Sequence, residues 1–569
     1  MPRIQTITAL CAFALLSACA KQEKESADLI FKNGVIYTVD PANPWVEAIA
    51  IKGDRILQVG SNEEMEALRT DKTQVTDLGG KFAMPGFIEG HGHFSGLGQS
   101  LLNLNFMKAK SWDEIVQMVA EKAKTAKPGE WIIGRGWHQE KWSEPLAQNV
   151  LGYPYHDALS AVSPNNPVML SHASGHSLFA NAKAMELAGV SAETPNPSGG
   201  EIVRDSRGKA IGVFEERAMG VIRSAYQEYV ATLSPEDRKA EWFKGIEAAE
   251  AECLKKGITS FQDAGSSFEE LDRYREMAEK GQLNLRLWAM IRHSYADMKD
   301  RLDGFPWIDL GDHFLTVRAI KTELDGALGA FGAWLLAPYA DKKGFMGQNT
   351  TAVEEVERIA GLASQHGLQL CVHAIGDRAN RETLNVFERA LAQSTNKDLR
   401  WRIEHAQHLD TADIPRFKQL GAIASMQAIH CTSDAPFVVK RLGTERARYG
   451  AYPWRSLLDA GAVVTNGTDA PVEDVDPLAS YYATVTRKRP DSGQAFFPEQ
   501  ALTREEGIYS YTQACAFAAF EEKDKGSLSP GKFADLIVVS NDLVRCPEED
   551  ILKSQILLTV VGGKVKYKK

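Results

Sequence analysis

The sequence predicts an α/β protein whose main part is a closed (β/α)₈ barrel. Three observations support this fold class. Apolar strand-like segments alternate with amphipathic helical stretches through the middle of the chain. The two ends of the chain are instead rich in short strands and turns, which predicts one small β-sandwich built from both termini. A long stretch after the first barrel strand exceeds a single βα unit and predicts a large insertion.

Length and composition describe an ordinary globular protein with two or three domains. The chain has 569 residues, of which 44% are hydrophobic and 25% charged, and a formal net charge of −10. This acidic balance argues against a nucleic-acid partner, because no basic stripe is present to displace phosphate counterions. The cysteines show no C-x-x-C spacing, so a cysteine-ligated zinc site is not indicated.

The first element is an export signal. Residues 1–18 contain a short apolar core that ends in small residues, and Cys19 follows before an abrupt polar switch. The segment Leu16-Ser17-Ala18-Cys19 resembles a bacterial lipobox, which implies a lipidated Cys19, residues 19–27 as a tether, and a lipid-anchored protein that faces the periplasm. Ala20 then implies the outer membrane in a Gram-negative host. The alternative is an unlipidated signal peptide that is cut nearby.

The second element is the sandwich, which we expect to comprise residues 28–82 and 520–569. Asn33-Gly34 and Gly53-Asp54 are hairpin turn signals in the first part. The segments "GSLSPGKFADLIVVS" and "ILLTVVGGKVKYKK" supply strands at the other end of the chain.

The third element is the barrel, predicted over residues 83–519 with an insertion at about 95–237. Its eight candidate strands lie in the segments 82–93, 258–265, 285–293, 314–326, 368–377, 400–407, 421–430 and 462–474. Helical stretches such as "TAVEEVERIAGLASQHG" lie between most of them. In a TIM-type barrel of this kind the active site lies at the C-terminal ends of the strands.

Residues able to bind a metal recur at these strand ends. His91 and His93 are two apart, so on a strand both imidazoles leave the same face. The later strands end with Lys321, His373, His405 and Asp469, in that order. Each residue alone has a structural explanation, such as a snorkelling lysine, a satisfied core histidine or a helix cap. Their recurrence at one end of the barrel favours a functional site.

This pattern resembles the amidohydrolase superfamily of metal-dependent hydrolases. The motifs "HAIGDRA" (373–379), "RIEHAQ" (402–407), "GTDAPVED" (467–474) and "GSLSPGKFADLIVV" (526–539) resemble the amidohydrolase-3 branch, which includes YtcJ-like proteins and N-substituted formamide deformylase. The resemblance covers essentially the whole mature chain. One departure is Glu89, which stands where many relatives have Asp two residues before the first histidine.

The residue types and the resemblance together imply a metal centre. Imidazoles and a carboxylate suit one or two divalent ions; Zn²⁺ is favoured, with Fe²⁺ or Mn²⁺ as alternatives. Such an ion activates water and polarises a carbonyl group. The resemblance implies that Asp469 moves the proton from the attacking water to the leaving amine. It also implies that Lys321 is either N-carboxylated as a bridge between two metals or unmodified beside one.

Other polar residues have less defined roles. We expect Asp377 and Arg378 either to orient His373 or to cap the next helix. Glu404 is expected to be structural, because strand alternation directs it away from the face of His405. His172 and His176, in a loop-like part of the insertion, are candidates for contacting the substrate.

The sequence therefore predicts a hydrolase that acts on non-peptide C–N bonds of a small-molecule substrate, such as a linear or N-substituted amide. The alternatives are a metal-dependent esterase, lactonase or deaminase on the same barrel, and a binding lipoprotein without catalysis. A membrane contact is expected through the lipid anchor alone. The oligomeric state stays open, a homo-oligomer included.

Overall fold

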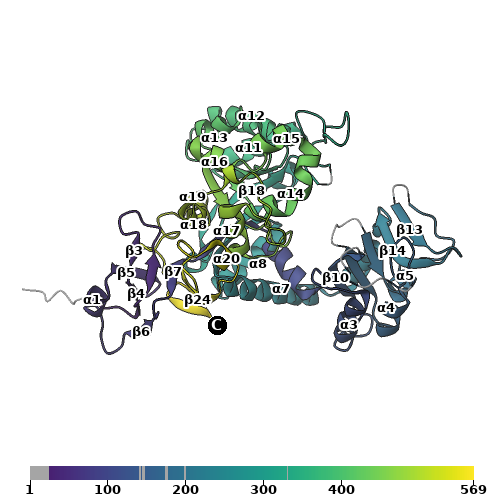
Figure 1. Ribbon diagram of the computed structural model, residues 1–569, viewed down its shortest axis with the longest axis horizontal. Helices are drawn as coiled ribbons and strands as arrows, with labels where there is room; N and C mark the ends of the chain where they lie inside the picture. Colours follow the sequence, from purple (N-terminus) through teal and green to yellow (C-terminus); the bar gives the residue numbers. More distant parts are fainter. Residues whose placement is uncertain are drawn as a thin grey trace, which may run out of the picture.

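The computed structural model describes residues 25–139, 142–143, 146, 148–172, 177–197, 200–329 and 331–569. Cys19 and His176 lie outside these residues. Three parts are visible in Figure 1: the sandwich with both chain ends, the barrel, and the insertion, which extends to the right. Among the described helices, none has the length and apolar character needed to cross a membrane.

The barrel confirms the predicted fold class. Its eight parallel strands follow each other around a nearly closed sheet in the order of the sequence. They are β8 (Phe87–Gly92), β15 (Ile258–Ser266), β16 (Arg286–Ile291), β18 (Leu315–Glu323), β19 (Gln369–Ala374), β20 (Arg402–His405), β21 (Ile423–Met426) and β22 (Val463–Asn466). The short β17 (Trp307–Asp309) pairs with β18 outside this path.

Amphipathic helices cover the outside of the barrel. They bury one apolar face against the strands, as Val356, Ile359 and Ala363 do on α11, and expose the polar face. The main covering helices are α7 (Pro235–Lys255), α8 (Phe268–Glu279), α11 (Val353–Gln365), α12 (Asp377–Gln393), α13 (Ile414–Leu420), α14 (Ala428–Leu442), α15 (Thr444–Gly450), α16 (Trp454–Asp459), α17 (Pro477–Thr486), α18 (Arg504–Ser510) and α19 (Gln513–Ala518).

Two glycines allow the first and last strands to approach each other. A Cβ atom on Gly90 would lie 2.3 Å from the backbone oxygen of Asn466, and one on Gly467 would lie 2.6 Å from the backbone nitrogen of His91. The approach is fixed by backbone hydrogen bonds from Asp469 to His91 (2.8 Å) and from His93 to Ala470 (2.7 Å). The loop after β22 is thereby held against the end of β8.

The sandwich joins the two chain ends, as predicted. One sheet contains β5 (Arg55–Gly60), β4 (Ala48–Lys52), β1 (Leu29–Lys32) and β6 (Gln74–Asp77). The other contains β25 (Lys564–Lys568), β24 (Ile556–Val561), β23 (Leu536–Val539), β7 (Phe82–Pro85), β2 (Val35–Tyr37) and β3 (Trp45–Val46). Side chains of both sheets, such as Ile49 and Val538, share one apolar core.

The predicted first barrel segment, 82–93, proves to be two strands. Pro85 ends β7, which pairs with β2 and β23 of the sandwich, and β8 begins at Phe87 in the barrel. A Cβ on the intervening Gly86 would lie 2.2 Å from Thr259, so this position leaves no room for a side chain. One apolar run therefore contributes a strand to the sandwich and a strand to the barrel.

The insertion forms its own sheet and apolar cores. The strand order is β13 (Gly200–Arg204), β14 (Ala210–Glu216), β12 (Ser177–Ala180), β11 (Val168–His172), β10 (Ile132–Trp137) and β9 (Leu104–Asn105). The helices α3 (Trp112–Ala123), α4 (Asp157–Val162), α5 (Ala182–Leu187) and α6 (Met219–Thr232) accompany this sheet. Helix α2 (Phe94–Leu102) leads into the insertion from the barrel, and α7 leads back to it.

Candidate metal centre

The predicted ligand residues come together at the C-terminal ends of the barrel strands. His91, His405 and Asp469 each offer a ligand atom, and these three atoms all lie within 4.8 Å of one another. His93 Nε2 lies 3.3 Å from Asp469 Oδ1. The ring of His373 packs 4.4 Å from the ring of His405, measured between centroids.

Lys321 belongs to the same group of side chains. It lies on β18, is almost completely buried, and interacts electrostatically with Glu404 and Asp469. Burial lowers the pKa of its ammonium group below the usual range, although these carboxylates oppose the shift. A lysine with a lowered pKa is more readily deprotonated, which is the form that reacts with CO₂.

The backbone is strained at two of the clustered residues. The backbone φ is 73° at His405 and 58° at Asp469. This is a left-handed conformation that residues other than glycine rarely adopt. Ala406 continues the strain with φ of 41°. Strained residues of this kind persist where the surrounding structure fixes them, and they concentrate at functional sites.

The donor atoms suit a divalent metal ion. His91 Nε2, His373 Nε2 and Asp469 Oδ1 are buried and make no hydrogen bond with the described residues. Buried polar atoms normally have a partner, so the unpaired His91 Nε2 and Asp469 Oδ1, which lie 3.5 Å apart in this cluster, fit an ion. Burial lowers the pKa of His91 to about 4 and that of His373 to about 3. Both imidazoles are therefore neutral at pH 7, which is the form that binds metals.

Glu404 has a different role from the one that strand alternation predicted. Its buried carboxylate contacts His91 Nδ1 and also pairs with Arg402, whose Nε lies 2.7 Å from Oε1. His91 therefore donates from Nδ1 and presents Nε2 to the centre. The alternation argument failed because His405 leaves the β region at positive φ, so its side chain does not continue the strand pattern.

Two other predicted ligands, His405 and His373, have specific neighbours. His405 Nδ1 contacts Gln427 Oε1 at 2.6 Å. His373 Nε2 lies 3.6 Å from Asp325, a carboxylate that accepts hydrogen bonds from the backbone of Trp334, Ile375 and Gly376. The Gln427 contact fixes the orientation of the His405 ring.

Glu89 supports the centre through the backbone. It accepts hydrogen bonds from Thr468 N at 2.6 Å and Thr468 Oγ1 at 3.0 Å, directly before Asp469. Burial raises the pKa of Glu89 to about 8 despite these bonds. Glu89, which stands where many relatives have Asp, thus holds the loop after β22 against β8.

The remaining predicted residues have other surroundings. Asp377 accepts hydrogen bonds from Leu336 N at 2.8 Å and Arg378 N at 2.9 Å at the start of α12, so it fastens a loop and does not orient His373. The Arg378 guanidinium lies 4.5 Å from the ring centroid of Trp334. His172 ends β11 and packs against Trp137 and His138 in the insertion.

One histidine of the centre was not predicted from the sequence. His430 lies in the first turn of α14, with Nε2 3.4 Å from Asp469 Oδ2 and Nδ1 3.5 Å from Glu473 Oε1. Burial would lower its pKa, but the hydrogen bonds with both carboxylates raise it to about 10. The segment 421–430 reads as one strand in the sequence, whereas β21 ends at Met426 and the helix begins two residues later.

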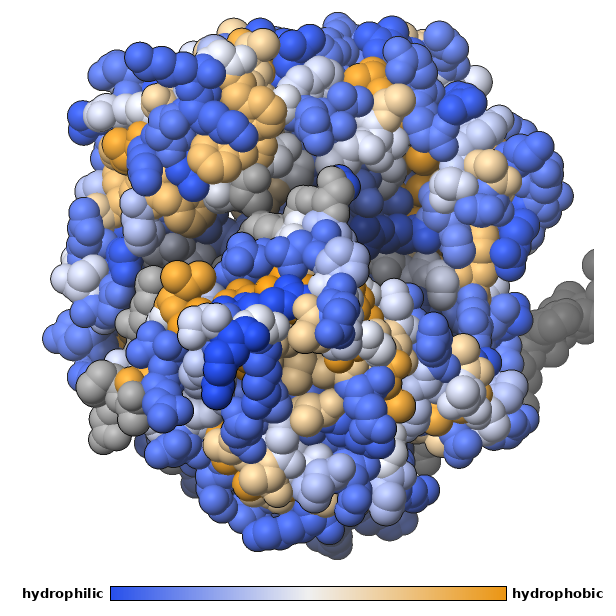
Figure 2. Space-filling model, turned by 90° about the vertical axis from the view of Figure 1, so that its right-hand side faces the viewer, coloured by the Kyte–Doolittle hydropathy of each residue, from blue (hydrophilic) through white to orange (hydrophobic). Residues whose placement is uncertain are grey.

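The insertion contacts the mouth of the barrel beside Asp469. Arg135, on β10, donates from Nη1 to the backbone oxygen of Pro471 at 2.9 Å. Figure 2 views the molecule from the side of the insertion and shows the surface hollowed between an upper and a lower mass. The insertion is therefore placed to border the approach to the centre.

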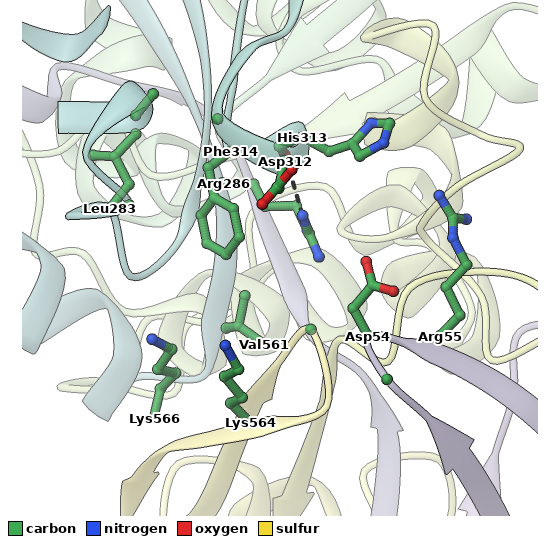
Figure 3. Close-up of a pocket in the computed structure, with 15 residues that line it drawn as sticks. Asp54, Arg55, Leu283, Arg286, Asp312, His313, Phe314, Val561, Lys564 and Lys566 are labelled. Atoms are coloured by element: carbon green, nitrogen blue, oxygen red, sulfur yellow. Dashed lines mark hydrogen bonds between the residues drawn. The ribbon is translucent and has the colours of Figure 1, made fainter. Parts of the chain in front are cut away.

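A large cavity lies elsewhere, at the opposite end of the barrel. Its volume is about 730 Å³, and it is lined where β16 and β18 begin, by Arg286 and Phe314, and by turns of the sandwich. Figure 3 shows Lys564 and Lys566 on one side and Asp54 and Arg55 on the other. Because the predicted metal ligands lie at the other strand ends, this cavity is separate from the candidate centre.

Comparisons with known proteins agree with this geometry. The family model described as "Amidohydrolase family" matches residues 74–567. The putative amidohydrolase YtcJ of Bacillus subtilis is 30% identical, over 95% of this chain and 99% of its own length. The N-substituted formamide deformylase of Arthrobacter pascens is 28% identical, over 95% and 98% respectively. The crystal structure of an uncharacterized metal-dependent hydrolase from Pyrococcus furiosus superposes with a TM-score of 0.73 at 26% identity, covering 91% of this chain and all of that one. The chain therefore belongs to the amidohydrolase family, as the sequence motifs predicted.

Proposed function

We propose that this protein hydrolyses a non-peptide C–N bond of a small molecule, most directly a linear or N-substituted amide. The observation that carries the proposal is the convergence of neutral imidazoles and the Asp469 carboxylate on one buried point. The activity named for the Arthrobacter relative, deformylation of N-substituted formamides, supports an amide as the substrate class.

In this proposal His91, His93, His373, His405, Lys321 and Asp469 hold one or two divalent ions, with Zn²⁺ favoured by the ligand types. A bound ion would supply activated water near neutral pH and polarise the substrate carbonyl. Asp469 accepts the proton of the attacking water and transfers it to the leaving amine. Burial alone would raise the pKa of Asp469, but the contact with His430 and the neighbouring histidines His93 and His91 lower it well below the usual range, so the carboxylate is ionised and can accept that proton.

We further propose that Lys321 is N-carboxylated and bridges two ions. Its buried side chain, its lowered pKa and its position beside the histidines support this. The alternative is a single ion beside an unmodified lysine, and the Lys321→Ala variant distinguishes the two.

The proposal also includes export. Cys19 after Leu16-Ser17-Ala18 supports a lipid-anchored protein that faces the periplasm. Mass spectrometry of the mature N-terminus should find an acylated cysteine at position 19. An unmodified N-terminus produced by cleavage elsewhere would contradict the anchor and leave the enzymatic proposal untouched.

A substrate panel tests the function directly. Metal-loaded protein is assayed with N-substituted formamides, linear amides, esters, lactones and amino-purines, each with and without prior treatment by a chelator. We expect amide turnover that chelation abolishes and Zn²⁺ restores. Turnover of esters, lactones or amino-purines alone would favour the corresponding alternative. A protein that takes up no metal when it is supplied, and turns over none of these compounds, would favour a binding function.

A further inference from the structure

His430 stands between two carboxylates at the edge of the metal centre. Its side chain is 11% exposed, and its two ring nitrogens face different residues. Nε2 is directed at Asp469 Oδ2 (3.4 Å), and Nδ1 is directed at Glu473 Oε1 (3.5 Å). A ring held at both nitrogens has little freedom to rotate.

The two oxygens of Asp469 are thereby assigned to different partners. Oδ1 lies 3.5 Å from His91 Nε2 and 3.3 Å from His93 Nε2, and makes no hydrogen bond within the described residues. Oδ2 faces His430 instead. If the carboxylate rotated about its Cβ–Cγ bond, Oδ2 would face the histidines and this division would be lost.

The backbone around His430 has neighbours of its own. The Tyr452 hydroxyl donates to Asp434 (2.7 Å) and lies 3.4 Å from the backbone oxygen of His430. Gln427, which orients His405, lies three residues before His430 at the start of α14. One short segment thus supports ligands on two different strands.

Glu473 completes the arrangement from the other side. It lies four residues after Asp469, and the intervening loop turns through a backbone hydrogen bond from Val472 N to Asp469 O of 2.8 Å. Both carboxylates that face the His430 ring, Asp469 at Nε2 and Glu473 at Nδ1, therefore belong to one turn.

We propose that His430, oriented by Glu473, is a positioning residue that restricts Asp469 to the use of Oδ1 toward the ion and keeps Oδ2 as a separate, hydrogen-bonded oxygen. The inference rests on the proposed metal-dependent function. It adds a residue outside the predicted ligand set, with a defined geometric task.

Two matched variants separate the two contacts of the ring. In His430→Gln the amide nitrogen can occupy the place of Nε2 and keep the contact with Asp469. In His430→Asn the amide nitrogen replaces Nδ1, so the contact with Glu473 can persist while that with Asp469 is lost. The readouts are Zn²⁺ affinity by competition with a chromophoric chelator and the absorption spectrum of the Co²⁺-substituted protein, which needs no substrate.

We expect His430→Asn to weaken Zn²⁺ binding by roughly 10–100-fold and to alter the Co²⁺ spectrum, as loss of an outer contact to a ligand typically does. His430→Gln should retain most of the affinity and the spectrum. Glu473→Ala, at a partly exposed side chain, should change both readouts in the same direction as His430→Asn but by less. If circular dichroism shows that His430→Asn does not fold, Glu473→Ala replaces it as the test variant.

Wild-type affinity in His430→Asn, or equal losses in the Asn and Gln variants with native circular dichroism, would overturn the inference. These results differ from a failure of the proposed function, which would appear as a wild-type protein that binds neither Zn²⁺ nor Co²⁺.

Discussion

Replacing Glu404 with glutamine tests the contact that orients His91. Both carboxylate oxygens face donors: Oε1 faces Arg402 Nε at 2.7 Å, and Oε2 faces Arg402 Nη2 at 3.0 Å as well as His91 Nδ1. The nearly isosteric Glu404→Gln must direct its NH₂ group at one of these donors. If it faces His91, Nδ1 becomes the acceptor and the proton moves to Nε2, the atom needed by the metal.

The structure sets the size of the two expected effects. Arg402 and Glu404 are both completely buried, and removing one partner of a buried ion pair typically costs about 3–5 kcal/mol of stability. Part of that cost is offset here, because Arg402 also donates to Gln262, Gly90 and Ser425. Loss of the correct tautomer of His91 should weaken Zn²⁺ binding by roughly 10–100-fold.

A second buried pair in the same chain is the matched control. Arg286 and Asp535 are 2% and 5% exposed and form contacts of 2.8 and 3.2 Å at the junction of barrel and sandwich. Asp535→Asn should lower the urea midpoint in the same way but leave Zn²⁺ affinity unchanged. Wild-type Zn²⁺ affinity in Glu404→Gln, or an equal loss of affinity in Asp535→Asn, would refute the reasoning.

Two further variants examine the centre and its surroundings. Lys321→Ala should lose metal and activity if the lysine is carboxylated, and short carboxylic acids should restore part of both; full metal occupancy without rescue would support the single-ion alternative. Arg135→Gln removes the guanidinium that donates to Pro471 O beside Asp469, so kcat/KM should fall while metal content by elemental analysis stays at the wild-type value. An unchanged kcat/KM would show that this contact between insertion and barrel does not affect the reaction.

The sequence predicted the barrel because its signal is periodic. Most barrel strands are apolar runs followed by an amphipathic helix, and the candidate ligand types recur where several of these runs end. His91, His405 and Asp469 could therefore be named in advance as candidate ligands, and the structure brings them together.

The sequence did not reveal which residues orient these ligands, because that depends on pairs far apart in the chain. Glu404 contacts His91 across 313 positions, and no pattern on either strand indicates the other. His430 was missed for a local reason: in the segment 421–430 only Gln427 separates the strand from the helix, and no Gly, Pro, Asn or Asp marks the boundary. Asp325, 3.6 Å from His373 Nε2, lies in the predicted strand segment 314–326, but β18 ends at Glu323, so strand alternation does not place its side chain.

The central claim is that Asp469 serves as both metal ligand and proton acceptor, and Asp469→Asn tests it most directly. The two side chains are nearly isosteric, so the turn after β22 should keep its shape. Asparagine still offers an oxygen to the ion but cannot accept the proton of the attacking water, and removal of a positioned general base typically lowers the rate by ~10²–10⁴. The decisive measurement is kcat of the Zn²⁺-loaded variant on an amide that the wild type hydrolyses. The account predicts a fall of that size in kcat, with KM little changed and the protein folded and still partly metallated. Near-native turnover by Asp469→Asn would contradict the account.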